Sequence, residues 1–169
     1  MSSSDEQRTQ GASDDPPPAR EEEGANAAHL SPQPWPWLGP RVLIEHADGD
    51  RADALAVSLR RAGYAVAICP GPAPDDRCPL ADDENCAAAE GADLVVSGLG
   101  LELAGTRDAL AALRTRLPRT PLIVEAPLQH AARWYRLVEG CELVEPPASP
   151  DHVVERVRAL LEGKGSSVA

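Results

Sequence analysis

The sequence predicts an α/β domain with a doubly wound parallel sheet of five strands. Short aliphatic runs alternate with segments in which apolar residues recur at helical spacing, over residues 41–162. Because helices separate successive strands, the connections must be right-handed crossovers, which place helices on both faces of the sheet. The hydrophobic fraction of 43% is sufficient for a core, and the absence of Phe leaves Ala, Val and Leu to fill it.

Short apolar runs are the expected strands, since buried parallel strands are apolar on both faces. They cover residues 41–46, 64–69, 93–99, 121–126 and 141–145. The expected helices cover residues 50–62, 83–90, 106–117, 128–139 and 150–162. Asp50 is suited to cap the first helix and Gly63 to end it. Ser149 can cap the last helix, with Pro150 in its first position.

Composition divides the chain into three segments. Residues 1–40 are an expected disordered, acidic, Pro-rich tail, residues 41–162 the folded domain, and residues 163–169 a loose C-terminal tail. The N-terminal tail has too few aliphatic residues to offset the entropy lost on ordering. Within it, Trp35 and Trp37 alternate with proline. Their rings either pack on the edge of the domain or form a short linear motif for a protein partner.

The net charge of −11 argues against nucleic acid and anionic lipid, which both require a basic surface. No run approaches the roughly 20 consecutive apolar residues that span a bilayer, and the N-terminus lacks a basic-then-apolar signal pattern. We therefore expect a cytoplasmic protein, with mostly reduced cysteines and no nucleic-acid or membrane partner. Glycine-rich phosphate loops and serine nucleophile elbows are missing from the sequence, so an enzyme is not expected.

The segments that carry the expected strands also carry a family resemblance. RVLIEHADGD begins the domain, GADLVVSGLGL and TPLIVEAP lie in its middle, and GCELVEPPASPDHVVERVRALL ends it. Together they resemble the receiver domain of bacterial response regulators, over residues 41–162. The resemblance implies a flavodoxin-like sheet of order 2-1-3-4-5, with the functional loops at the carboxyl ends of the strands.

The resemblance also implies where receiver chemistry would lie: an acidic pair for Mg²⁺, an aspartyl phosphoacceptor, a hydroxyl residue and a lysine. In an alignment without gaps, the acidic pair falls on His46 and Ala47 and the phosphoacceptor on Gly98. The hydroxyl residue falls on Ala126 and the lysine on Glu145. A shift of one residue brings Glu45 into the acidic pair but puts Ser97 at the acceptor position. Either register predicts a pseudo-receiver that is not phosphorylated. A cis bond before Pro146 is also implied.

A Pro-, Asp- and Cys-rich segment stands where receivers have their second helix. The three cysteines of this segment, which covers residues 69–86, could meet His46 at one rim of the sheet; they are Cys69, Cys78 and Cys86. Thiolates and imidazole suit zinc or, less well, an iron–sulfur cluster, although the gaps are longer than the usual C-x₂-C turn. The same thiols could instead form a redox disulfide or stay reduced and unmodified. Unless the metal alternative holds, no cofactor is expected.

Trp134 and Tyr135 are adjacent on the fourth expected helix, so both rings cannot face the core. Exposed aromatics often anchor protein interfaces. In receivers the fourth helix, fifth strand and fifth helix form a contact face, and the resemblance implies this face here. The leading hypothesis is a phosphorylation-independent signalling module that binds another protein or, as a homodimer, a second copy of itself. The alternative is a thiol- or metal-based sensor that uses the cysteine segment with His46.

Overall fold

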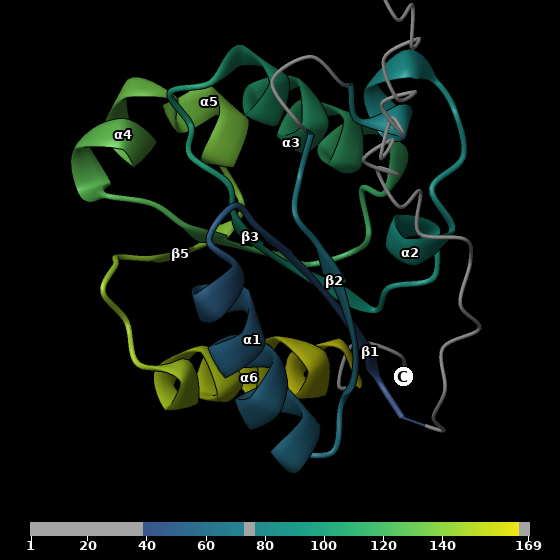
Figure 1. Cartoon of the computed structure of the whole chain (residues 1–169), viewed down its shortest axis with the longest axis vertical. Helices are drawn as coiled ribbons and strands as arrows, with labels where there is room; N and C mark the ends of the chain where they lie inside the picture. Colours follow the sequence, from purple (N-terminus) through teal and green to yellow (C-terminus); the bar gives the residue numbers. More distant parts are fainter. Residues whose placement is uncertain (1–38, 73–76, 166–169) are drawn as a thin grey trace, which may run out of the picture.

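The computed structural model describes residues 39–72 and 77–165, which form a parallel sheet with helices on both faces (Figure 1). The strands are β1 (Arg41–His46), β2 (Ala65–Cys69), β3 (Leu94–Gly98), β4 (Leu122–Glu125) and β5 (Glu142–Val144). Their order, β2-β1-β3-β4-β5, confirms the predicted sheet. The helices are α1 (Gly49–Arg61), α2 (Ala87–Glu90), α3 (Ala104–Arg116), α4 (Leu128–Arg133), α5 (Tyr135–Val138) and α6 (Pro150–Gly165), with a 3₁₀ turn, η1 (Pro79–Asp82).

Alternate side chains of each strand enter one of two aliphatic cores. Val42 and Ile44 of β1 pack against α1 and α6, whereas Leu43 packs toward α3 and the short helices around it. Figure 1 shows the same division, with α1 and α6 on one side of the sheet and α2 to α5 on the other. Because consecutive strand residues face opposite sides, Glu45 and His46 must enter different environments.

Side-chain caps fix the start of two helices. Asp48 caps α1, because its Oδ1 accepts a hydrogen bond from the Arg51 amide at 3.1 Å. The predicted cap, Asp50, lies instead inside the first turn. The last helix begins as predicted, and the Ser149 hydroxyl oxygen accepts a hydrogen bond from the His152 amide at 3.2 Å.

The connections after β2 and β4 differ from the prediction. The second expected helix is shortened to α2 and preceded by η1, which ends at Asp83 in the left-handed region with φ 60°. The single helix expected over residues 128–139 is divided into α4 and α5, because Trp134 departs from helical geometry (φ −110°, ψ 32°). The cis bond joins Pro146 to Pro147, one residue later than predicted.

Parts of the chain lie outside the described residues. These are the N-terminal tail up to residue 38, with Trp35 and Trp37, and residues 73–76 and 166–169. α6 continues past the predicted domain end at residue 162. Within the described part, no helix is both long and apolar enough to cross a membrane.

Candidate functional site at the carboxyl ends of the strands

The carboxyl ends of β1, β3 and β4 bring His46, Gly98 and Glu125 into one row across the sheet. His46 pairs with Gly98, and the pairing of Ser97 with Val124 one position earlier puts Glu125 beside Gly98. Neighbours in one row of a parallel sheet face the same side. Here that side is the one covered by α1 and α6. The side chains of His46 and Glu125 therefore approach each other over Gly98, which has no side chain.

The imidazole of His46 lies over Gly98 and reaches toward Glu125. A Cβ on residue 98 would lie 2.5 Å from Nε2 of His46 and would overlap the rest of the ring. Nε2 lies 3.7 Å from Oε2 of Glu125, which is within electrostatic contact but too far for a hydrogen bond. This arrangement therefore requires glycine at position 98.

Hydrogen bonds orient both partners of this contact. Nδ1 of His46 accepts a hydrogen bond from the Asp48 amide at 3.0 Å, so the neutral ring carries its proton on Nε2, toward Glu125. The other carboxylate oxygen, Oε1 of Glu125, accepts a hydrogen bond from the guanidinium of Arg51 on α1. These three side chains, named here the His46–Glu125–Arg51 cluster, join β1, β4 and α1.

The cluster is largely removed from water. The side chains of His46, Glu125 and Arg51 are 13%, 3% and 21% exposed. A carboxylate buried to this degree requires a cation, and Arg51 supplies it. Removal of one partner from a buried pair costs about 3–5 kcal/mol, because the other charge is left without compensation. The cluster therefore holds this edge of the sheet as a unit.

Other residue types occupy the positions that the resemblance assigns to receiver chemistry. Gly98 has no side chain, and the side chains of Ala47 and Ala126 carry no oxygen or nitrogen atoms. Glu145 is exposed, and the carboxylate that meets His46 is instead Glu125. Neither Glu125 nor its partner on α1, Arg51, was predicted from the sequence. The available signal was a charged residue inside the apolar run PLIVEA, since a buried charge needs a partner.

Glu45 faces the other side of the sheet and forms a second polar group. It stands between Cys69 of β2 and Ser97 of β3 in the sheet register. Glu45 is 4% exposed, and its Oε2 has no hydrogen-bond partner among the described residues. Burial raises the pKa of Glu45 to about 7, against a smaller lowering by its hydrogen bond with Ser97. The group is therefore a buried acid that holds its proton up to neutral pH.

Three free thiols lie around this acid, and we name the set the Glu45–cysteine cluster. Its cysteines are Cys69, Cys78 and Cys86. Burial raises the pKa of Cys69 to about 11, and the nearby charge of Glu45 adds to this shift. The pKa of Cys78 is also raised, again mainly by burial. Thiolates are therefore scarce at these two positions near neutral pH.

The predicted metal site does not assemble in the structure. Its expected ligands are Cys69, Cys78, Cys86 and His46. Glu45, and not His46, is the neighbour of Cys69 across the strands, because consecutive residues face opposite sides. Both ring nitrogens of His46 are directed elsewhere, to Asp48 and Glu125. Over residues 39–72 and 77–165, no group of three or more His, Cys, Asp or Glu side chains is placed to hold a metal ion.

The adjacent aromatic residues have different surroundings, as predicted. Tyr135 is 56% exposed, whereas Trp134 is partly buried against the core on the α3 side. The guanidinium carbon of Arg107 lies 4.3 Å from the centre of the Trp134 ring, a cation–π contact that ties α3 to the α4–α5 junction. Leu128 of α4 and Leu143 of β5 are also exposed.

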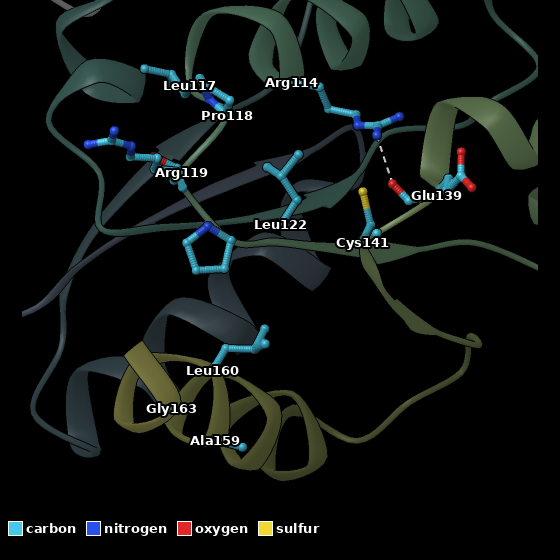
Figure 2. Close-up of a pocket in the computed structure, with 13 residues that line it drawn as sticks. Arg114, Leu117, Pro118, Arg119, Leu122, Glu139, Cys141, Ala159, Leu160 and Gly163 are labelled. Atoms are coloured by element: carbon cyan, nitrogen blue, oxygen red, sulfur yellow. Dashed lines mark hydrogen bonds between the residues drawn. The ribbon is translucent and has the colours of Figure 1, made fainter. Parts of the chain in front are cut away.

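A cavity of about 650 Å³ opens at the opposite, amino end of β4 and β5 (Figure 2). Leu122, Cys141 and Leu160 are among the residues that line it. At its rim, Arg114 donates a hydrogen bond to the carbonyl of Glu139 at 2.7 Å, which closes the end of α5. The end of α3, the segment before β4, the segment before β5 and α6 surround the cavity, and none of its lining residues belongs to either polar cluster.

Solved structures share the fold of this chain. A response regulator receiver domain protein from Methanospirillum hungatei JF-1 matches with a TM-score of 0.57 and 19% identity, over 76% of this chain and 98% of that chain. The receiver domain of the Francisella response regulator 1452 matches with a TM-score of 0.54 and 18% identity, over 75% and 99%. A member of a family of redox sensors in the streptococci, described as evolved from two-component response regulators, matches with a TM-score of 0.56 and 15% identity, over 75% of this chain and 53% of that chain.

No family model and no curated protein matches the sequence. The fold defines a receiver-like α/β domain, which confirms the resemblance inferred from the sequence. At these low identities the likeness concerns the fold alone.

Replacement of Gly98 by alanine tests the packing of His46. The added methyl displaces the imidazole from its place beside Glu125, so the free energy of unfolding should fall by about 1–3 kcal/mol. Denaturant unfolding measures this change. Gly49→Ala is the matched control, because nothing lies within 4 Å of that position, and its stability should be unchanged or higher. Similar effects of the two substitutions would contradict the packing described for His46.

The burial of Glu45 predicts that the stability of the domain falls as pH rises. Between pH 4.5, the ordinary pKa, and about pH 7, the raised pKa, Glu45 keeps its proton in the folded state but has released it in the unfolded state. The contribution of protonated Glu45 to the free energy of unfolding is therefore complete below pH 4.5. It is lost as pH rises through about 7, and the total loss is about 3 kcal/mol. Denaturant unfolding across this range measures the slope. Glu45→Gln should flatten it, and an unchanged slope in that variant would exclude Glu45 as the cause.

Proposed function

We propose that this chain is a phosphorylation-independent pseudo-receiver that regulates another protein in signal transduction by binding it. The observation that carries the proposal is the His46–Glu125–Arg51 cluster packed over Gly98. A receiver edge filled in this way offers neither a carboxylate nucleophile at the acceptor position nor a set of hard oxygen ligands for Mg²⁺. On this proposal the chain is a cytoplasmic binding module, not an enzyme, and requires no cofactor.

The proposed contact surface lies on α4, α5, β5 and α6. Its exposed apolar residues are Leu128, Tyr135 and Leu143, at 56%, 56% and 38%. The neighbouring Trp134 is held by Arg107, so Tyr135 projects from a fixed position. A second copy of the chain could use the same surface in a two-fold dimer. The net charge of −11 favours a protein partner over nucleic acid or an anionic membrane. Trp35 and Trp37 remain a proposed second contact.

A thiol-based sensor is the second candidate function. Cys69, Cys78 and Cys86 lie close enough to influence one another electrostatically. A protein described as a redox sensor of the streptococci also shares the fold. However, burial raises the pKa of Cys69 and Cys78, and thiols that hold their protons react slowly with oxidants. This chemistry supports the binding module in preference to the sensor.

Phosphorylation can be tested directly with acetyl phosphate and Mg²⁺. We expect no acyl phosphate on this chain under conditions that label an intact receiver domain, because Gly98 provides no nucleophile. Intact-mass spectrometry measures the label, and the intact receiver is the positive control. A label that maps to Glu45 or Glu125 would contradict the proposal, since it would show a replacement acceptor at the same edge.

The proposed contact surface can be tested by substitution of Tyr135. Truncation of an exposed aromatic anchor should weaken self-association or partner binding by about tenfold or more. Val57→Ala is the matched control, because Val57 is 46% exposed but lies on α1, which is not one of the elements of this surface. Sedimentation measures self-association, and quantitative capture from host extract measures partner binding. Equal effects of Tyr135→Ala and Val57→Ala would contradict the assignment of the surface.

A further inference from the structure

Glu45 is a buried acid that the proposed binding function does not use. It is 4% exposed, and its Oε2 lacks a hydrogen-bond partner within the described part of the chain. The polar groups around it are Ser97 of β3, Cys69 of β2 and Cys78 of the segment after β2, and Cys86 lies near both of these cysteines. All of these are neutral groups, so Glu45 has no cation within its own cluster.

Among the described residues, the other elements packed on this side place no cation beside Glu45. Arg116 of α3 is engaged instead by the Glu84 carbonyl and by the Glu90 carboxylate of α2, the latter at 3.7 Å. The inward-facing residues of α3 and α2 are Thr106, Ala109, Leu110, Leu113 and Ala89. η1 contributes the buried Leu80, while Asp82 of the same turn pairs at 3.2 Å with the exposed Arg77. His46, the next residue in the chain, faces the opposite side. An ionised Glu45 would therefore be a buried carboxylate without compensation, which is unfavourable.

The wall formed by η1 and α2 is the part of this environment most easily opened. Each of these elements is a single turn of four residues, and neither has a side-chain cap. β1 and β3, by contrast, are hydrogen-bonded on both sides within the sheet. Short turns with few hydrogen bonds open at a lower free-energy cost than central strands. Water that solvates an ionised Glu45 would therefore enter from the side of η1 and α2.

We propose that Glu45 is a proton-operated switch whose ionisation loosens η1 and α2 from the core that they share with α3 and the sheet, and widens the access of water to the partly buried Cys69 and Cys78. The neutral acid keeps this wall closed at lower pH, and the carboxylate opens it at higher pH. Burial raises the pKa of Glu45 to about 7, so the transition falls near neutral pH. The switch does not depend on the proposed binding function, and it would respond to proton concentration without a phosphoryl group.

Hydrogen exchange of the full chain at about pH 6 and about pH 8 tests the switch. After correction for intrinsic exchange rates, the protection of η1 and α2 amides should fall about tenfold between these pH values, following the ionised fraction of Glu45. Amides of α1 and α6 should follow the global free energy of unfolding at each pH, whereas the loss in η1 and α2 should be insensitive to low denaturant, as expected of a local opening. Glu45→Gln stays neutral and should remove the change in η1 and α2. An equal loss in Glu45→Gln, or a loss in η1 and α2 with the denaturant dependence of global unfolding, would overturn the proposal.

A second measurement uses the unaltered chain, so it does not depend on the folding of Glu45→Gln. Carbon NMR of the Glu45 carboxyl gives the midpoint of its titration, and the amide shifts of Leu80 and Ala81 report the opening of η1. The two midpoints should coincide near neutral pH. A Glu45 midpoint below about pH 5, close to the value of an exposed carboxyl, would overturn the proposal. Amide shifts that follow a different midpoint, or none, would do the same.

Discussion

The contact of the His46 ring with Gly98 is the constraint on which the functional edge of this domain depends. A side chain at position 98 would occupy the space that the imidazole needs to approach Glu125. Glu125 in turn accepts the Arg51 guanidinium, so β1, β4 and α1 are joined through one buried carboxylate. Glycine at position 98 and the approach of His46 to Glu125 are therefore parts of one structural feature.

Two polar clusters share this edge because β1 ends with two polar residues in succession. The alternation of a strand sends His46 toward α1 and Glu45 toward α3. On the first side, opposite charges compensate one another out of water. On the second side, a neutral acid and thiols occupy an apolar core, and burial disfavours their charged forms. The His46–Glu125–Arg51 cluster is therefore suited to hold a fixed structure, and the Glu45–cysteine cluster is suited to respond to a change in pH.

The sequence was sufficient for the fold but not for the site. Short aliphatic runs and helical spacing are local signals, so the strands were predictable, whereas the order of the strands in the sheet was implied by the resemblance to receiver domains. The partnership of Arg51 with Glu125 spans 74 residues and has no local signal. His46 and Cys69 were expected to ligate one metal ion because the strands that they end are neighbours. The strands are neighbours, but the register pairs Glu45 with Cys69. Trp134 was expected within a helix, but α4 ends there and α5 begins after it. Its cation–π contact with Arg107 is also not indicated by any local pattern in the sequence.

A double-mutant cycle on Arg51 and Glu125 tests the central claim most directly, with Arg51→Met and Glu125→Gln compared singly and together by denaturant unfolding. A buried charge pair that holds the edge should give a coupling free energy above about 1 kcal/mol. The same cycle in a Gly98→Ala background should give a smaller coupling, because the displaced His46 ring no longer confines the carboxylate. Additive effects, within about 0.5 kcal/mol, would contradict the claim that these residues form one cluster.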